Sequence, residues 1–396
     1  MKQPAGVLIG RELTKFLLLA ILVRLVRDTG VRMMYPFLPA YAAGLGVTLT
    51  AMGVLLSLRN GAILLAPYFG HLSDRGGPRR LLLFGFGLLA LGMTVMGWAN
   101  GMVMAAAAFV LLGLSDAINT ALMQAYVSDH SPVAMRGRAL AIVEYAWAIT
   151  GIALLPLVGW LIAAVSWQTP FRLMGLAAVA AMLLLAFAMP GDPPRSNRPH
   201  LTLRTQMAGI VRDRSAFAAV LASGLVFIAV ETVFVVWGAH LERRFGFDPA
   251  QIGGVAVIIG LAELGGSVLS SLIIDKTGKR RGTTAGVLAF IFILALMPWL
   301  DRSLALVVTG LALASMCLEY TVVSSIPLLG QQRPGSRASV FAMGVMMAAM
   351  TRGATDAVAT WLFENVAFLA AMGYALIALV GSAWLLWRRV EERAEA

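Results

Sequence analysis

The chain has 396 residues, of which 59% are hydrophobic and 13% are charged. A mean hydropathy of +0.83 and recurrent apolar stretches of about 20 residues are typical of a helical protein that crosses a membrane many times. This composition excludes a disordered chain, a collagen and a secreted disulfide scaffold, and the single Cys317 can form no internal bridge. The net charge of +11 comes from basic residues spread over several short segments, which argues against one nucleic-acid-binding patch.

Apolar stretches separated by charged or Gly/Pro-rich breaks predict twelve transmembrane spans. They begin near Phe16, Ala51, Leu81, Met102, Ala139, Phe171, Phe217, Ala250, Thr283, Ser303, Ala338 and Val366. The first span carries charged residues and lacks the clean apolar centre of a cleavable signal peptide, so we expect the chain to retain it. An even number of spans places both termini on the same side of the membrane.

The distribution of Lys and Arg indicates which side that is. The segments on the side of the termini hold most of these residues, whereas the opposite loops hold only Arg172, Arg243, Arg244 and Arg302. Cytoplasmic loops of membrane proteins carry an excess of Lys and Arg. The sequence therefore predicts a multi-pass protein of the cell (inner) membrane with both termini in the cytoplasm.

The longest polar interval, residues 191–216, contains several prolines followed by a short amphipathic stretch. It predicts a cytoplasmic linker between an N-terminal half, residues 1–190, and a C-terminal half, residues 217–396. The halves repeat, with these residues recurring at shifts of 200 or 201: Gly46 as Gly246, Gly53 as Gly253, Asp74 as Asp275, Gly77 as Gly278 and Arg80 as Arg281. Repeats of six spans are typical of alternating-access transporters, whose site lies at the midplane between the halves.

The loop after the second span is GHLSDRGGPRR, and its counterpart after the eighth span is SLIIDKTGKRR. Together with the twelve spans and the central linker, these loops resemble the signature of the major facilitator superfamily over essentially the whole chain. The resemblance implies an all-α membrane fold of twelve transmembrane helices in two pseudo-symmetric halves. The sequence departs from the drug and proton antiporters of that family at Phe109, where they usually carry an arginine in the fourth span.

The resemblance also implies a cytoplasmic gate. Asp74 and Arg75 match the loop acid that caps a neighbouring helix and the arginine that pairs with another acid, and Asp129 is the expected partner. Glu144, near the start of the fifth span, is expected to belong to the same gate. The other gate residues supplied by the two loops are Gly70, Gly77, Arg79, Arg80, Asp275, Lys276, Gly278 and Arg280. The alternative is that these charges only enforce the topology.

Charged residues inside the spans are the strongest functional signal, because each costs about 2.5 to 3.5 kcal/mol near the bilayer centre. The spans hold Arg24, Arg27, Asp28, Arg32, Arg59, Asp116, Glu144, Glu231, Glu263, Glu319, Arg352 and Asp356. The N-terminal half has four Arg and three acids, net +1, and the C-terminal half has one Arg and four acids, net −3. This pattern predicts a polar, water-filled path between the halves.

The first span carries the expected substrate contacts. Arg24, Asp28 and Arg32 follow at four-residue steps, and Arg27 and Tyr35 lie near the same helical face. Asp28 can pair with either flanking arginine, and the surplus guanidinium charge is suited to a carboxylate, phosphate or sulfate. The alternative is a ladder that only fixes helix packing.

Two further residues, Arg59 and Asp116, are also expected to contact substrate. Proton coupling is expected at Glu231 and Glu319, with Glu263 and Asp28 as further candidates, because an unpaired buried carboxylate can exchange protons near neutral pH. Asp356 lies four residues after Arg352 and is expected to be its salt-bridge partner.

The sequence thus predicts a secondary active transporter that works by alternating access, most concretely a proton-coupled exporter of small amphipathic or anionic organic compounds. The alternatives are a lipid or glycolipid flippase and an uptake carrier for organic anions. No GxxxxGK[ST] loop is present, and the four histidines are dispersed, so we expect no enzymatic activity, no metal and no cofactor. The expected partners are a small-molecule or lipid substrate, protons and the bilayer, and the chain is expected to act as a monomer.

Overall fold

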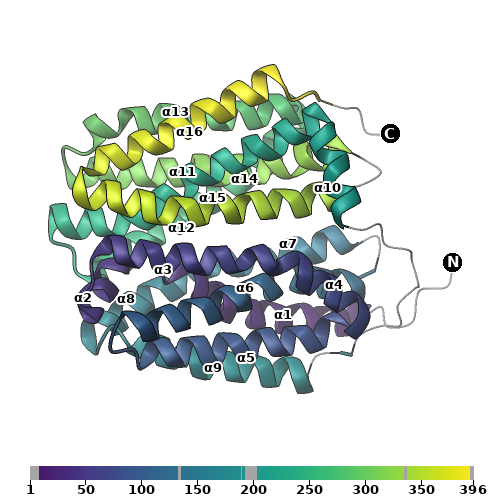
Figure 1. Ribbon diagram of the computed structural model, residues 1–396, viewed down its shortest axis with the longest axis horizontal. Coiled ribbons are helices and arrows are strands. Elements are labelled where there is room, and N and C mark those ends of the chain that lie inside the picture. The colour runs from purple at the N-terminus through teal and green to yellow at the C-terminus, as the bar shows by residue number, and fades with distance from the viewer. Residues whose placement is uncertain (1–8, 133–134, 189, 192–202, 334–336, 393–396) are drawn as a thin grey trace.

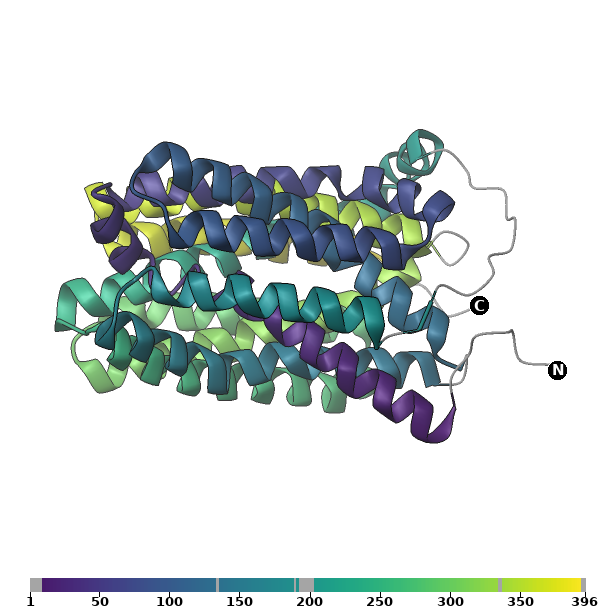
Figure 2. The ribbon, with the colours of Figure 1, turned by 90° about the horizontal axis from the view of Figure 1, so that it is seen from below.

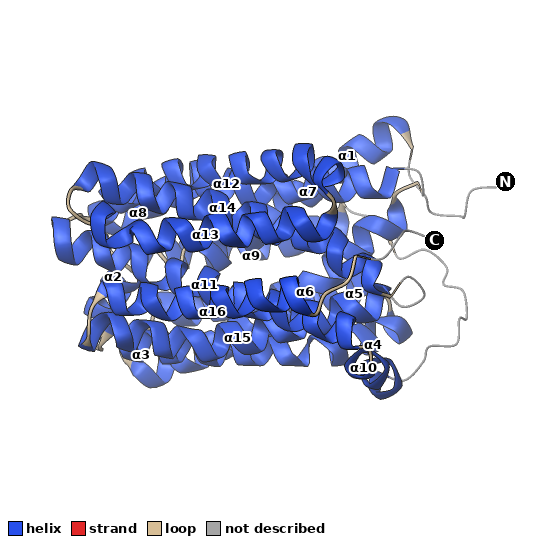
Figure 3. Cartoon of the chain, turned by 90° about the horizontal axis from the view of Figure 1, so that it is seen from above, coloured by secondary structure: helices blue, strands red, loops and turns tan. Residues whose placement is uncertain are grey.

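The computed structural model describes residues 9–132, 135–188, 190–191, 203–333 and 337–392, and all regular structure in these ranges is helical (Figure 3). The N-terminal half contains α1 (Gly10–Arg32), α2 (Leu38–Leu45), α3 (Leu49–Ala62), the short 3-10 helix η1 (Ile63–Leu65), α4 (Ala66–Gly76), α5 (Pro78–Gly97), α6 (Met102–His130), α7 (Arg136–Ile149), the π-helical segment η3 (Thr150–Leu154), α8 (Leu155–Ala164) and α9 (Thr169–Phe187). The C-terminal half contains α11 (Arg214–Phe245), α12 (Pro249–Thr277), α13 (Lys279–Leu300), α14 (Leu304–Gln332), α15 (Arg337–Asn365) and α16 (Phe368–Arg388), and the short α10 (Leu203–Arg212) precedes it.

The long helices run between two ends of one bundle, and both chain termini lie at the same end (Figure 1). We call this end the terminal face and the opposite end the far face; the view in Figure 2 shows the same arrangement after a 90° turn. Ten helices of the described chain are long and apolar enough to cross a membrane. The other two long helices are α1 and α15, which carry several of the buried charges. Together they give the predicted twelve-helix architecture.

The sequence repeat between the halves extends to the backbone. Gly46 and Gly246 end α2 and α11 with φ of 67° and 69°, and Gly77 and Gly278 end α4 and α12 with φ of 86° each. Positive φ is accessible to glycine at little cost, whereas a Cβ would be strained there. The same glycine therefore ends the corresponding helix in each half.

The two halves pack together near the far face, mainly through α8 with α12 and α3 with α15. At the first contact, a Cβ on Gly159 would overlap the carbonyl of Pro249, and one on Gly253 would lie 2.9 Å from Cα of Pro156. These glycines let the two backbones approach closely, as small residues do between membrane helices.

The contact between α3 and α15 includes a polar cap. The carboxylate of Glu364, near the end of α15, accepts hydrogen bonds from the backbone N–H groups of Leu49 (3.2 Å) and Thr50 (2.8 Å) at the start of α3. One turn further in, Gly53 faces the side chain of Thr360. The carboxylate satisfies two of the free N–H groups of the helix start. The α3–α15 contact therefore holds the two halves together near the far face.

The boundaries differ most from prediction at the first span. It is expected to begin near Phe16, but α1 begins at Gly10, because Arg11, Glu12 and Lys15 are good helix formers despite their polarity. The short α2 is also absent from the predicted elements, since its eight residues precede the second span, which is expected to begin near Ala51. The amphipathic α10 lies within the predicted linker and packs on α11 and α15.

Candidate functional site

A cavity lies between the two halves, at the level of the buried charges. Its walls come from α1, the turn after it, α7, α8, α11, α12 and α15: Val31, Arg32, Tyr35, Pro36, Trp147, Leu155, Phe234, Trp237, Ile259 and Arg352. Four aromatic rings and two guanidinium groups thus face one space. Such a mixture of apolar surface and a few polar groups is typical of a small-molecule site.

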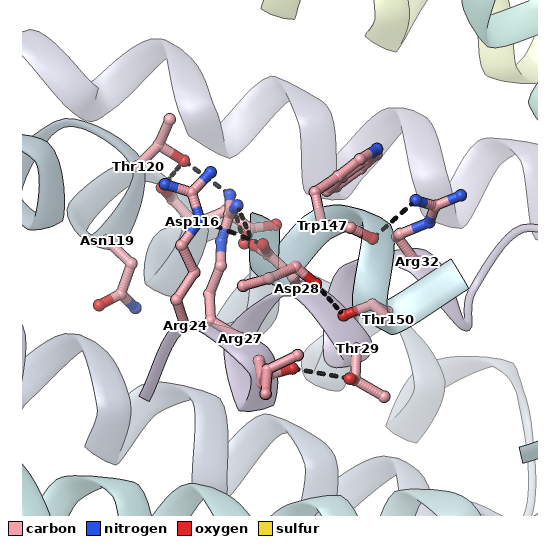
Figure 4. A network of polar contacts seen from close by, with 12 residues as sticks. Arg24, Arg27, Asp28, Thr29, Arg32, Asp116, Asn119, Thr120, Trp147 and Thr150 are labelled. Atoms are coloured by element: carbon pink, nitrogen blue, oxygen red, sulfur yellow. Dashed lines mark hydrogen bonds and ion pairs between the residues drawn. The ribbon is translucent and has the colours of Figure 1, made fainter. Parts of the chain in front are cut away.

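Asp28 is fully buried in α1 and is held between two arginines (Figure 4). Its carboxylate lies 3.1 Å from Nε of Arg24 and 2.9 Å from Nη1 of Arg27. The guanidinium of Arg24 also pairs with Glu144 of α7. The expected pairing of Asp28 with Arg24 is confirmed, whereas its second partner is Arg27 and not Arg32.

Arg27 continues this network into α6. Its Nη2 donates to the hydroxyl of Thr120 (2.7 Å) and lies 3.5 Å from Asp116. The carboxylate of Asp116 also forms a buried ion pair with Arg59 of α3. Arg24 and Arg27 line a second cavity inside the N-terminal half and not the central cavity. The network therefore ties α1, α3 and α6 of one half together.

We expect Asp116→Asn to destabilise the protein, since Arg59 would keep a buried charge without its acid. Breaking a buried ion pair from one side costs about 3–5 kcal/mol. Replacing both partners by apolar residues, in Arg59→Met with Asp116→Leu, should restore most of that stability. The check is the free energy of unfolding of the purified variants in micelles, and a loss below about 1 kcal/mol for Asp116→Asn would contradict the assignment.

Arg32 joins the two halves. Its Nη1 lies 2.9 Å from Glu263 of α12, and its Nη2 donates to the same carboxylate at 3.1 Å. It also donates to the backbone carbonyl of Trp147 (3.0 Å) and stacks on the Trp147 ring at 4.4 Å. The expectation of a surplus guanidinium charge in the first span is therefore wrong, because Arg27 and Arg32 both contact carboxylates from other helices.

Glu319 of α14 lies next to this bridge. Its carboxylate accepts a hydrogen bond from Ser267 of α12 (2.9 Å) and interacts electrostatically with Glu263 and Arg32. Among the described residues, no guanidinium comes within 4 Å of it. Glu319 is thus a half-buried carboxyl group whose only hydrogen bond among the described residues comes from a neutral hydroxyl.

A second acidic cluster lies between α11, α15 and α3. Arg352 pairs with Glu231 at 3.0 Å, and both Glu231 and Asp356 are fully buried. The amide of Asn60 donates to Asp356 (2.7 Å) and lies 3.4 Å from Glu231. The expected pair of Arg352 with Asp356 is therefore wrong, since α11 brings Glu231 to the guanidinium instead.

The charged groups within the spans do not balance. Across the described spans, the five arginines Arg24, Arg27, Arg32, Arg59 and Arg352 each form an ion pair with a carboxylate. The acids of the same spans number seven: Asp28, Asp116, Glu144, Glu231, Glu263, Glu319 and Asp356. Glu319 and Asp356 are the two without an arginine in the described chain. The surplus is thus acidic and belongs to the C-terminal half.

The remaining expected substrate residue, Tyr35, is placed in the central cavity. It interacts electrostatically with Arg59, and its ring lies 5.8 Å from that of Phe234 in the other half. Of the expected substrate residues, Arg32 and Tyr35 therefore line the cavity, while Asp28 and Asp116 hold the arginines behind it.

The loops expected to form the gate lie at the terminal face. The side chains of Asp74, Arg75 and Asp275 lie outside the described part of the structure, so their capping and pairing stay predictions. Gly70 lies within α4, and Lys276 is exposed at the end of α12.

Two loop arginines fasten helix ends within their own halves. Arg79 of α5 donates to the carbonyl of Leu185 in α9 at 3.4 Å, and Arg280 of α13 donates to that of Trp387 in α16 at 2.8 Å. Arg80 is exposed. These contacts brace each half and do not cross between the halves.

Two of the acids expected at the gate, Asp129 and Glu144, lie on different helices. Asp129 is half-buried near the end of α6, and Glu144 lies deeper along α7 and pairs with Arg24. Sequence reasoning missed Asn60 and Ser267, the neutral partners of the surplus acids. A polar side chain directly after Arg59 in an apolar span is a signal that could have found Asn60.

Comparisons with known proteins agree with this architecture. The profile of the Major Facilitator Superfamily matches residues 20–355. The chain is 24% identical over 278 residues to multidrug resistance protein 2 of Bacillus subtilis (strain 168), which covers 66% of this chain and 68% of that protein.

Two solved structures resemble the fold. One is an inward-facing bacterial homologue of the human lysosomal transporter Spinster, with a TM-score of 0.78 and 13% identity over 98% of this chain and 100% of that chain. The other is a D-xylose–proton symporter, with a TM-score of 0.71 and 17% identity over 96% of this chain and 98% of that chain.

Proposed function

Because the chain belongs to the Major Facilitator Superfamily, we propose that it is a proton-coupled exporter of small amphipathic organic compounds that works by alternating access. The observation that carries the proposal is the central cavity, where aromatic rings of both halves meet, together with the carboxyl group of Glu319, which has no ion pair within the described part of the chain. A relative named as a multidrug resistance protein supports export as the direction.

Alternating access requires links between the halves that can break and re-form. The Arg32–Glu263 ion pair and the Asn60–Asp356 hydrogen bond are two such links, and both lie beside the cavity. Their free energy depends on the charge of the acids, so proton uptake or substrate binding can shift the balance between the two open states. This supports a carrier mechanism.

Proton coupling is assigned to Glu319. A half-buried carboxyl group whose only hydrogen-bond donor among the described residues is a hydroxyl can bind a proton reversibly, whereas Asp28 and Glu263 each form ion pairs with guanidinium groups. We assign the terminal face to the cytoplasm, on the excess of Lys and Arg there. Because the tight helix contacts lie near the far face, we infer that the described conformation faces the cytoplasm.

A second candidate function is uptake of organic anions. It is favoured by Arg352, because its side chain is 24% exposed and lines the central cavity. A guanidinium in an apolar cavity is a suitable partner for a carboxylate or sulfonate.

The test is flux into proteoliposomes under an imposed pH gradient, with three naphthalene probes: a trimethylammonium cation, a neutral sulfonamide and a sulfonate. An exporter that exchanges compound for protons should accumulate a probe in vesicles with an acidic lumen. Protein-free vesicles measure passive entry. If a pH gradient of either sign drives accumulation of none of the probes, the proposal is wrong.

A further inference from the structure

The two arginines that line the central cavity are held differently. Arg32 has a side chain that is only 5% exposed, and it is occupied by the Glu263 carboxylate and by the Trp147 carbonyl. Arg352 is 24% exposed, lies over the Phe227 ring at 5.1 Å and has one ion pair in the described chain, with Glu231 through Nε. The terminal nitrogens of its guanidinium are therefore the donors that a ligand in this cavity can reach.

The acids behind Arg352 form a closed pair. Glu231 and Asp356 are both fully buried, and the side-chain amide of Asn60 reaches both, at 2.7 Å from Asp356 and 3.4 Å from Glu231, so the two carboxyl groups lie close together. Two carboxyl groups that share a buried site repel each other when both are charged, which favours a proton on one of them. In addition, Oδ1 of Asp356 is a buried oxygen without a hydrogen-bond partner among the described residues. The pair therefore has room for a further proton.

Few other charges face this cluster. Tyr35 from the turn after α1 and Arg59 from α3 interact with it electrostatically, and Arg59 is neutralised by Asp116. From α16, the Tyr374 hydroxyl lies 3.4 Å from Thr355, next to Asp356.

The helix α14 also packs on α11 and α15. Its acid, Glu319, is held at Ser267 of α12. None of these neighbours supplies a second cation to the pair, so its proton occupancy decides the net charge around Arg352.

We propose that Arg352 is the anion-binding residue of the central cavity and that an anion binds there together with one proton, which the Glu231–Asp356 pair takes up. With one proton on the pair, the cluster of Arg352, Glu231 and Asp356 is neutral. An anion alone would leave a buried negative charge, whereas an anion with a second proton keeps the cluster neutral. The second proton neutralises Glu231 and frees the guanidinium for its ligand.

The inference rests on the proton-coupled transport proposed above. It adds, for organic anions, the direction in which the proton moves relative to the substrate. Ligands that bind in a linked manner raise each other's affinity by the same factor. An organic anion bound at Arg352 would therefore move in the same direction as its proton. Only compounds without an anionic group would then be transported in the direction opposite to the proton.

The test uses binding of 2-naphthalenesulfonate to the full-length protein in micelles. This probe stays ionised across the pH range, so linked protons come from the protein alone. Affinity should rise about tenfold for each unit that pH falls between 8 and 6, with about one proton taken up per sulfonate bound. The neutral 2-naphthalenesulfonamide should show no such slope. A flat profile for the sulfonate would overturn the proposal.

Variants separate the two parts of the site. The double variant Glu231→Gln with Asp356→Asn should bind the sulfonate at pH 8 at least as tightly as the wild type does at pH 6, with no pH slope. Arg352→Lys should lose affinity but keep the slope, because the charge remains while the planar fork is lost. Asp301→Asn, which removes an acid paired with His240 and Arg244 near the far face, is the control.

If the double variant shows the same pH slope as the wild type, the proton does not bind to the Glu231–Asp356 pair. If neither the wild type nor the double variant binds the sulfonate, Arg352 is not an anion-binding residue. Because the assay measures binding, it can succeed where transport fails. Linked proton uptake without gradient-driven flux of any probe would reject the proposed function alone. Gradient-driven flux without linked uptake would reject this inference alone.

Discussion

Glu319→Gln is expected to abolish accumulation driven by a pH gradient while exchange of substrate without a gradient persists. The amide fills the same space and can still accept the hydrogen bond from Ser267, but it cannot bind or release a proton. Substrate binding should survive because Glu319 is not among the residues that line the cavity. Accumulation should therefore fall to the level of protein-free vesicles, and equilibrium exchange should stay within about twofold of the wild type.

The measurement is uptake of a labelled amphipathic substrate into proteoliposomes, with and without an imposed pH gradient. Glu242→Gln is the matched control, since it makes the same chemical change at an exposed glutamate near the end of α11. Full gradient-driven accumulation by Glu319→Gln would show that the transported proton binds elsewhere. Loss of exchange together with accumulation would instead indicate a structural role.

The sequence predicts the architecture well because hydropathy and loop charge are local properties. Twelve apolar stretches give twelve long helices, and the paired glycines Gly46/Gly246 and Gly77/Gly278 mark helix ends that the repeat predicts. The start of α1 is missed because hydropathy locates the hydrocarbon core and not the helix, which extends past it into polar residues.

The sequence predicts which charged residues lie within the spans, but it does not predict which of them pair with one another. The i, i+4 rule correctly joins Arg24 to Asp28, which share one helix. It fails for Arg352, whose guanidinium reaches Glu231 on another helix although Asp356 lies at the same spacing. Within a helix the spacing fixes which side chains are neighbours. Between helices the packing decides, and a single sequence does not record it.

The link between Arg32 and Glu263 shows the same limit over a longer distance. The two residues are 231 positions apart in the chain and lie in different halves. Their pairing removes the surplus positive charge expected in α1 and moves the anion site, as we infer, to Arg352. The sequence therefore shows how many charges each half carries. Which arginine is available to a ligand is known only from the side-chain contacts in the structure.

Gly253→Val is expected to hold the far face open and to stop transport. Gly253 of α12 packs on α8 so closely that a Cβ would lie 2.9 Å from Cα of Pro156 and 3.2 Å from the carbonyl oxygen of Leu155. Both are backbone atoms that cannot rotate away, so α12 must move outward. Overpacking of this kind costs about 1–3 kcal/mol. That cost falls on the closed state alone and would lower its population relative to the open state by about 5- to 150-fold.

The neighbouring residue supplies the control. A Cβ on Gly254 would meet no atom within 4 Å, so Gly254→Val changes the same helix by the same side chain without touching α8. The readout is the rate at which an impermeant thiol reagent, added at the far face, labels Phe234→Cys in a Cys317→Ser background. Phe234 lines the central cavity, so its labelling reports whether the far face is open. Faster labelling in Gly253→Val and an unchanged rate in Gly254→Val would support closure by the α8–α12 contact. Equal rates in the two variants would contradict it, because the tight approach would then not control access to the cavity.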